Sequence, residues 1–201
     1  MRSHLYLASK SPRRSELLRQ IGVTHSIIKA DVDETPQKGE NPKDYVIRLA
    51  QEKALAGKAG LGKNENGLVL AADTSVVVDE RILGKPKDRQ EALEMMQLLS
   101  NRSHWVYSGV ALAGESLESR ISKNLVSFRE VTKDEAIAYW ESGEPADKAG
   151  GYAIQGLGSI FITRIEGSFS GVMGLPLFET TQLLIKAGID PLFNINEQMT
   201  R

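Results

Sequence analysis

The order of apolar and polar positions divides the chain into short elements from its first residues onward. The apolar run Leu5 to Ala8 predicts a strand, and apolar residues then recur on one face of a helix from Pro12 to about Ile21. Ser11 is expected to be the N-cap, with proline at the first helical position, and Gly22 to end the helix.

The rest of the chain alternates between the two periodicities. The segment 67–79 predicts a buried strand, a break at Asp73 and Thr74, and a second strand that ends in a tight turn at Asp79 and Glu80. Further strands are expected at 25–29, 104–114, 119–131 and 159–165, and further helices from Pro42, over 89–99, from Thr132 to about Ser142, and from Pro176 to about Ala187.

Strands and helices alternate in the first part of this pattern, whereas strands cluster in the middle. That order indicates an α/β fold with a mixed sheet and flanking helices rather than a purely parallel sheet. No linker marks a boundary, so we expect one domain over residues 1–201. The tail beyond Pro191 has weak periodicity and is expected to be loosely held.

Composition narrows the classes of function. The 25 basic and 26 acidic side chains give a net charge of −1, which argues against a nucleic acid polymer as partner. The chain has no cysteine, so disulfides and thiolate sites are excluded. The apolar run near the start is too short for a signal peptide, and no stretch approaches a membrane span. We therefore expect a soluble, cytoplasmic protein that does not contact membranes.

Two adjacent arginines stand where a helix usually carries acids. Arg13 and Arg14 fall in the first turn of the helix from Pro12, close to its positive end. A strand that leads into a helix N-terminus forms an anion site, to which the Ser9 and Ser11 hydroxyls can add donors. A phosphate group is one partner for these arginines, and solvent or nearby acids are the alternative.

Asp73 directly follows five apolar or small residues. A carboxylate at the C-terminal end of a strand can hold Mg²⁺ or take a proton from an attacking water. The alternative is an ordinary turn aspartate bonded to its own backbone.

Several lysines and acids could complete such a site. Lys85 lies on a Gly- and Pro-containing loop, and Lys53 lies near the apolar stripe of a predicted helix, so it either snorkels or points into a cleft. Glu34 belongs to an acidic loop that could supply metal ligands. For each of them, a solvated surface position is the alternative.

A glycine-rich segment, residues 142–158, contains the one further polar group of interest. Five glycines in 17 residues suggest backbone close to a ligand, or simply tight turns. The amide of Gln155 can pair with the edge of a uracil-like base.

Five ordered stretches together resemble the successive motifs of the Maf family of nucleoside triphosphate pyrophosphatases. The resemblance covers about residues 5–187. The stretches are LYLASKSPRRSELL, AADTSVVVD, ILGKPKDRQEA, GEPADKAGGYAIQGLG and GSFSGVMGLPL.

The resemblance implies a mixed α/β fold, distantly similar to inosine-triphosphate pyrophosphatases, with two lobes around a central cleft. It implies hydrolysis between the α and β phosphates of a nucleotide with a divalent cation, Mg²⁺ or Mn²⁺, and a homodimer. Asp73 corresponds to the family's proton acceptor, and Glu34 to an acid of the metal site. The phosphate-binding positions correspond to Arg13, Arg14, Lys53 and Lys85.

Three positions separate the subgroups of this family. The subgroup that prefers dTTP and UTP has Arg, Thr and Gln, which match Arg13, Thr74 and Gln155, whereas the subgroup acting on 7-methyl-GTP has Trp, Gln and Glu. We therefore expect dTTP, UTP and modified pyrimidine nucleotides as substrates. The alternative from another class is a nucleotide-binding regulator of septum formation without turnover.

Overall fold

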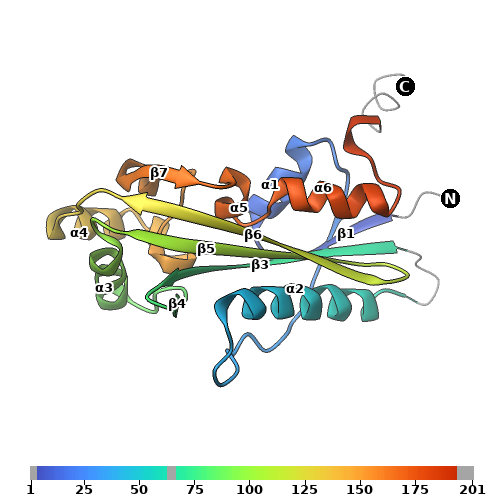
Figure 1. Ribbon diagram of the computed structural model, residues 1–201, viewed down its shortest axis with the longest axis horizontal. Helices are drawn as coiled ribbons and strands as arrows, with labels where there is room; N and C mark the ends of the chain where they lie inside the picture. Colours follow the sequence, from blue (N-terminus) through green and yellow to red (C-terminus); the bar gives the residue numbers. More distant parts are fainter. Residues whose placement is uncertain (1–3, 63–66, 194–201) are drawn as a thin grey trace.

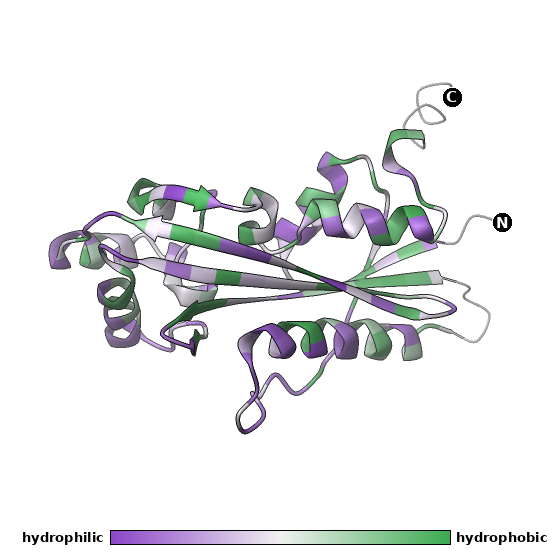
Figure 2. Ribbon diagram, viewed as in Figure 1, coloured by the Kyte–Doolittle hydropathy of each residue, from purple (hydrophilic) through white to green (hydrophobic). Residues whose placement is uncertain are grey.

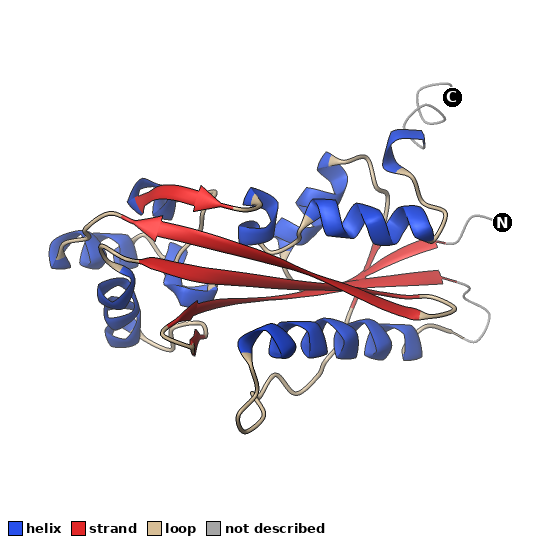
Figure 3. Ribbon diagram, viewed as in Figure 1, coloured by secondary structure: helices blue, strands red, loops and turns tan. Residues whose placement is uncertain are grey.

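The computed structural model describes residues 4–62 and 67–193, so the predicted loose tail lies outside the described residues from position 194 onward. A long twisted sheet runs through the molecule, with helices on both of its faces (Figures 1 and 3). The strands are β1 His4–Ala8, β2 Ser26–Ile28, β3 Gly67–Val78, β4 Arg81–Leu83, β5 Ser103–Ala113, β6 Leu117–Phe128 and β7 Ile162–Glu166. The helices are α1 Pro12–Gln20, α2 Pro42–Ala59, α3 Arg89–Leu99, α4 Lys133–Glu141, α5 Phe169–Met173 and α6 Leu177–Lys186.

The sheet is mixed, as the sequence predicts. Its strand order is β2-β1-β3-β5-β6-β7, and β4 pairs with β3 outside this order. The pairs β1–β2 and β1–β3 are parallel, whereas β3–β5, β5–β6 and β6–β7 are antiparallel. The parallel part therefore comes from the alternating first third of the chain, and the antiparallel part from its strand-rich middle.

The predicted break in segment 67–79 is wrong, because β3 is one continuous strand of 12 residues. Asp73 and Thr74 pair with Gly109 and Ser108 of β5 without interruption. The long antiparallel ladder with β5 outweighs the low strand preference of an aspartate. Asp73 therefore lies in the middle of a strand and not at its C-terminal end.

One edge of β3 changes partner halfway along. Strand β1 pairs with it from Gly67 to Leu70, and β4 pairs with it from Val76 to Val78. Because β5 occupies the opposite edge, no strand of the described residues pairs with the stretch between Leu70 and Val76 on this side. The sheet is thus split at Asp73.

The two faces of the sheet have separate cores, because successive side chains of a strand point to opposite faces. On one face, Ala50 and Ala54 of α2 pack against small residues of β3 and β5. On the other face, Leu183 and Leu184 of α6 join the leucines of α1. Figure 2 shows hydrophobic and hydrophilic positions interspersed along α2 and α6.

At the far end of the sheet, a further cluster links α3 and α4 to β3, β5 and β6. The cluster beneath α1 and α6 and the cluster beneath α3 and α4 lie on either side of the split in β3, which agrees with the expected two lobes. The central strands run through both.

Small residues allow α2 to lie close to the sheet. A Cβ at Gly109, opposite Asp73 in the β3–β5 ladder, would lie 2.3 Å from the carbonyl oxygen of Val46 on α2. A side chain at this position would push α2 outward. The absence of one brings the polar residues of α2 within reach of Asp73.

Other local predictions need correction. The expected strand over 159–165 begins only at Ile162, because residues Leu157–Phe161 form a 3₁₀ turn. Helix α5 was not predicted, since its five residues are too few to show a periodicity. Ser11 occupies the N-cap position of α1, but its side chain makes no capping hydrogen bond.

No helix within the described part of the chain has the length and hydrophobicity that crossing a bilayer requires.

Candidate active site

A cavity of about 460 Å³ opens at the split edge of β3. That volume lies within the range of small-molecule sites in proteins. All nine residues that the sequence predicts for the site line this one cavity: Ser9, Arg13, Arg14, Glu34, Lys53, Asp73, Thr74, Lys85 and Gln155. They come from six separate segments of the chain, which only the fold brings together.

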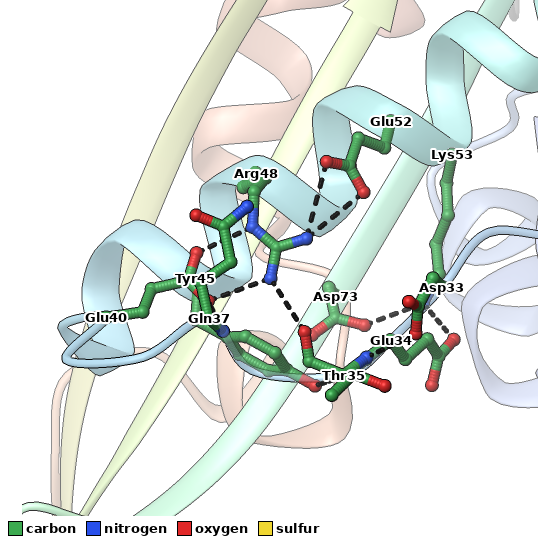
Figure 4. A network of polar contacts seen from close by, with 10 residues as sticks. All are labelled: Asp33, Glu34, Thr35, Gln37, Glu40, Tyr45, Arg48, Glu52, Lys53 and Asp73. Atoms are coloured by element: carbon green, nitrogen blue, oxygen red, sulfur yellow. Dashed lines mark hydrogen bonds and ion pairs between the residues drawn. The ribbon is translucent and has the colours of Figure 1, made fainter.

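Lys53 of α2 lies between two carboxylates. Its Nζ is 2.7 Å from Asp73 Oδ1 and 2.6 Å from Glu34 Oε1 (Figure 4). The side chains of Lys53 and Asp73 are both only 11% exposed. The prediction that Lys53 either snorkels or enters a cleft is thereby resolved, because its ammonium group points into the cavity.

The two carboxylates differ in their readiness to ionise. Burial raises the pKa of Asp73 above its usual value, and the charges of Lys53 and Arg14 only partly offset that effect. Burial also opposes ionisation of Glu34, but the hydrogen bond and charge of Lys53 outweigh it, so the pKa of Glu34 is lowered. A buried carboxylate with a raised pKa is suited to accepting a proton.

Arg14 lies on the opposite side of β3, next to Thr74. Its Nε donates to the carbonyl of Gly174 at 2.8 Å, Nη1 to Ser9 Oγ at 3.3 Å and Nη2 to Thr74 Oγ1 at 3.4 Å. A guanidinium has five N–H donors, so two of them remain for a ligand. Thr74 also contacts Ser108, with 2.7 Å between the hydroxyl oxygens.

Arg13 extends from the same helix turn toward the glycine-rich segment. Its Nη1 is 3.9 Å from Asp147 Oδ2. Asp147 in turn pairs with Lys148, and both residues line the cavity. The sequence pattern assigns this acidic-basic pair no role, since its position opposite Arg13 depends on the fold.

Lys85 and Gln155 complete the far wall of the cavity. Both residues are exposed, and each follows a constrained backbone segment. The N–H of Gly150 donates to the carbonyl of Gly84, which ties the glycine-rich segment to the loop that carries Lys85. At Gly150, φ is +69°, and a Cβ would lie 2.9 Å from Val76, so this close contact requires glycine.

The donor set is compatible with a divalent metal ion that is shared with phosphate. Within residues 4–62 and 67–193, no group of three or more His, Cys, Asp and Glu side chains is gathered as a metal site. Glu34 and Asp73 nevertheless bring two carboxylates to one ammonium group, and Mg²⁺ is typically held by one or two carboxylates plus substrate phosphates. These two oxygen donors fit a hard cation.

Tyr45 is a residue of the site that the sequence pattern does not single out. It lines the cavity, and its hydroxyl donates to the backbone carbonyl of Glu34 at 2.7 Å. The sequence signal that could have pointed to Tyr45 is its spacing of eight residues from Lys53, because residues at i and i+8 lie on the same side of a helix.

The chain shares 50% sequence identity with several proteins over most of their length. It is 50% identical over 192 residues to a protein named dTTP/UTP pyrophosphatase from Alkalilimnicola ehrlichii, which covers 94% of this chain and 95% of the relative. It is 50% identical over 187 residues to a protein of the same name from Pseudoalteromonas atlantica, with 92% and 97% covered.

Solved structures show a weaker similarity. The Staphylococcus aureus Ham1 protein aligns with a TM-score of 0.42 at 18% identity, over 80% of each chain. A nucleoside-triphosphatase, or dITP/XTP pyrophosphatase, from Mycobacterium abscessus aligns with a TM-score of 0.43 at 16% identity, over 98% of each chain. We draw no conclusion from similarity at this level.

The sequence model of the Maf-like protein family matches residues 4–187, which is nearly the whole described chain. This range includes every residue of the cavity described above. The chain therefore belongs to the Maf-like protein family.

Proposed function

We propose that this protein is a nucleoside triphosphate pyrophosphatase that hydrolyses dTTP and UTP to the nucleoside monophosphate and pyrophosphate. The observation that carries the proposal is that Arg13, Arg14, Lys53 and Lys85 line one cavity together with Glu34 and Asp73. The shared name of relatives that are 50% identical over most of the chain supports the same substrates.

The cationic residues bind the triphosphate in this proposal. Arg13 and Lys85 line the cavity from opposite sides of the split in β3, and two N–H donors of Arg14 have no partner among the described residues. Charge-assisted hydrogen bonds to phosphate are about twice as strong as neutral ones, and together they hold the chain of phosphates in one orientation.

Asp73 is the proposed proton acceptor. It takes a proton from a water molecule that attacks the α-phosphorus, while the bond from this phosphorus to the bridging oxygen breaks and pyrophosphate leaves. The ammonium group of Lys53, 2.7 Å away, favours the ionised form of Asp73 and partly offsets the effect of burial on its pKa. Without that ammonium group, burial alone would favour the protonated carboxyl, which cannot accept a proton.

Glu34 and Asp73 would hold Mg²⁺ or Mn²⁺ together with phosphate oxygens. The bound cation would offset the negative charge of the triphosphate. Glu34 and Asp73 lie 2.6 and 2.7 Å from Lys53, so the two carboxylates that would hold the cation also contact this ammonium group.

Gln155 and Thr74 select the base in this proposal. The exposed amide of Gln155 can both donate to a carbonyl of a pyrimidine and accept from its N3–H. Modified pyrimidine nucleotides with an intact imide edge are expected to be substrates as well.

Incubation with dTTP and Mg²⁺ or Mn²⁺ tests the proposal. We expect stoichiometric release of pyrophosphate and dTMP, and a loss of about 10²–10⁴-fold in kcat for Asp73→Asn, as is typical for removal of a general base. Nucleotide binding by Asp73→Asn is measured by calorimetry and should persist. Release of orthophosphate alone would show that a different bond is cleaved.

The rival hypothesis is a regulator of septum formation that binds nucleotide without turnover. A pure binder has no need of a buried carboxylate next to an ammonium group, which costs stability. Binding of dTTP without any pyrophosphate release under the same conditions would favour the regulator.

Three wider expectations remain predictions: a homodimer, a cytoplasmic location and a single domain over residues 1–201. Light scattering of the purified chain measures the first, fractionation of cells the second, and a single cooperative unfolding transition supports the third.

A further inference from the structure

Glu34 belongs to a stretch of chain that has no helix or strand of its own. It lies between the end of β2 at Ile28 and the start of α2 at Pro42. The Glu34 side chain is 60% exposed, so packing does not fix it beside Lys53. Its position must come from contacts that hold the backbone of this segment.

Two side chains of α2 provide such contacts. The hydroxyl of Tyr45 donates to the carbonyl of Glu34 at 2.7 Å, and Nη2 of Arg48 donates to the carbonyl of Thr35 at 3.3 Å (Figure 4). Tyr45 and Arg48 are three residues apart and so lie side by side on the helix. They donate hydrogen bonds to the carbonyls of two consecutive residues, Glu34 and Thr35.

Arg48 is itself rigidly held. Its Nε and Nη2 donate to the two carboxylate oxygens of Glu40 at 2.6 and 2.8 Å, and its Nη1 lies 3.2 and 3.3 Å from the oxygens of Glu52. The Glu40 side chain is only 8% exposed. A bidentate pair of this kind fixes orientation as well as distance.

The ion pair between Glu40 and Arg48 also restrains the end of this segment that leads into α2. Oε2 of Glu40 accepts the backbone N–H of Gln37 at 2.9 Å. The segment 34–40 is therefore fastened to α2 at Glu34, at Thr35 and again at Glu40. Lys53, which forms an ion pair with the Glu34 carboxylate, also belongs to α2. The same helix therefore positions both members of this ion pair.

We propose that Arg48, together with Tyr45, is a positioning residue that places Glu34 against Lys53 and Asp73. Arg48 does not line the cavity, so it acts through the backbone of 34–35 and not on a ligand. The kinetic part of this inference rests on the proposed function, in which Glu34 belongs to the catalytic set. The structural part does not.

Arg48→Ala is expected to lower kcat/KM for dTTP by about 10–100-fold, as is typical for groups that orient active-site ligands. Arg48→Lys should recover only part of this loss, because an ammonium group cannot form the bidentate pair. Arg129→Ala is the matched control, since Arg129 likewise pairs with both oxygens of a glutamate, Glu135, and donates to a backbone carbonyl outside the cavity. It should leave kcat/KM unchanged.

A double-mutant cycle separates positioning from general damage. If Arg48 acts through Glu34, then Arg48→Ala should cost less than about threefold in a Glu34→Gln background, where nothing remains to be positioned. Equal losses in both backgrounds would overturn the inference.

Hydrogen exchange gives a readout that needs no turnover. In Arg48→Ala and in the milder Tyr45→Phe, the backbone amides of Glu34, Thr35 and Gln37 should exchange faster, whereas those of β3 and β5 stay protected. Unchanged exchange at 34–37 would overturn the inference. An inactive wild-type enzyme would refute the proposed function instead, and the exchange data would then decide the positioning role alone. If Arg48→Ala fails to fold, Tyr45→Phe decides both readouts.

Discussion

A single ammonium group connects the acids of the candidate site. Lys53 contacts both Asp73 and Glu34, and it counters the burial that raises the pKa of Asp73. The proposed base is therefore tuned by its neighbour, since each charge at this distance shifts the balance between protonated and ionised forms.

Lys53→Met should move the acidic limb of the pH profile of kcat/KM toward higher pH. Burial already raises the pKa of Asp73, and Lys53 lowers it again, so removal of the ammonium group lets this pKa rise further. Because the ionised carboxylate is the active form, more alkaline solution is needed to reach the same activity. Initial rates with dTTP between about pH 5 and pH 9 measure the shift.

Lys43→Met is the control for this experiment, as Lys43 lies on α2 but does not line the cavity. It should leave the acidic limb in place. If the acidic limb also stays in place in Lys53→Met, then Asp73 is not the group whose titration produces this limb.

At the scale of elements, one carboxylate holds the two ends of the glycine-rich segment together. Glu144 accepts the Tyr139 hydroxyl at 2.6 Å and the backbone N–H groups of Leu157 and Gly158 at 2.8 and 2.9 Å. Burial opposes ionisation of Glu144, but these donors prevail and lower its pKa. The closed segment carries Gln155.

Glu144→Gln should lower the free energy of unfolding by about 1.5–3 kcal/mol, the usual worth of a hydrogen bond to a charged group. An amide can no longer accept all three donors. Urea unfolding at neutral pH measures the loss. A lowered pKa means that the ionised Glu144 carboxylate stabilises the fold, and this stabilisation is lost as the pH falls through the pKa of Glu144. The difference in the free energy of unfolding between wild type and Glu144→Gln should therefore shrink over the same pH range.

The exposed Glu141 near the end of α4 serves as the matched control. Glu141→Gln should change the free energy of unfolding by less than about 0.5 kcal/mol. Equal stability of Glu144→Gln and wild type would mean that the segment is closed by its backbone alone.

At the scale of the whole molecule, the cavity exists because the sheet is split and not because any loop is long. Strands β3, β5 and β6 continue through the molecule, while β1 and β4 share one edge of β3 and leave Asp73 and Thr74 between them (Figure 1). Residues from both ends of the sheet therefore face a common space.

We expect specificity for the nucleotide base to come from a residue that lines this cavity, Gln155. Gln155→Glu should reduce kcat/KM for dTTP and UTP by about tenfold or more, because a carboxylate cannot donate to a pyrimidine carbonyl. The side chain is exposed, so the free energy of unfolding should change by less than about 0.5 kcal/mol. Steady-state kinetics and urea unfolding are compared on the same preparation. Parallel losses of activity and stability would mean that Gln155 only supports the fold.

Much of the fold followed from local pattern. The helix starts at Pro42 and next to Thr132, and the turn at Asp79 and Glu80, are all present where the sequence predicts them. Each depends on contacts within a few residues, which is why a single sequence suffices to find them.

Residue chemistry was equally accessible. The nine candidate residues carry charged, amide or hydroxyl groups in six short stretches, and all nine line one cavity. Their roles remain predictions. What the pattern missed were residues such as Arg48 and Tyr45, whose partners are backbone carbonyls that carry no sequence signal.

The sequence by itself determined the elements, the mixed α/β class and the chemical groups available to the site, because these depend on local periodicity and on residue type. Only the tertiary structure decided that β3 continues through Asp73, that one of its edges is open there, and that Lys53 meets both carboxylates. Those features depend on which distant strand or helix lies alongside, and the free energy of such pairing comes from contacts between residues far apart in the chain.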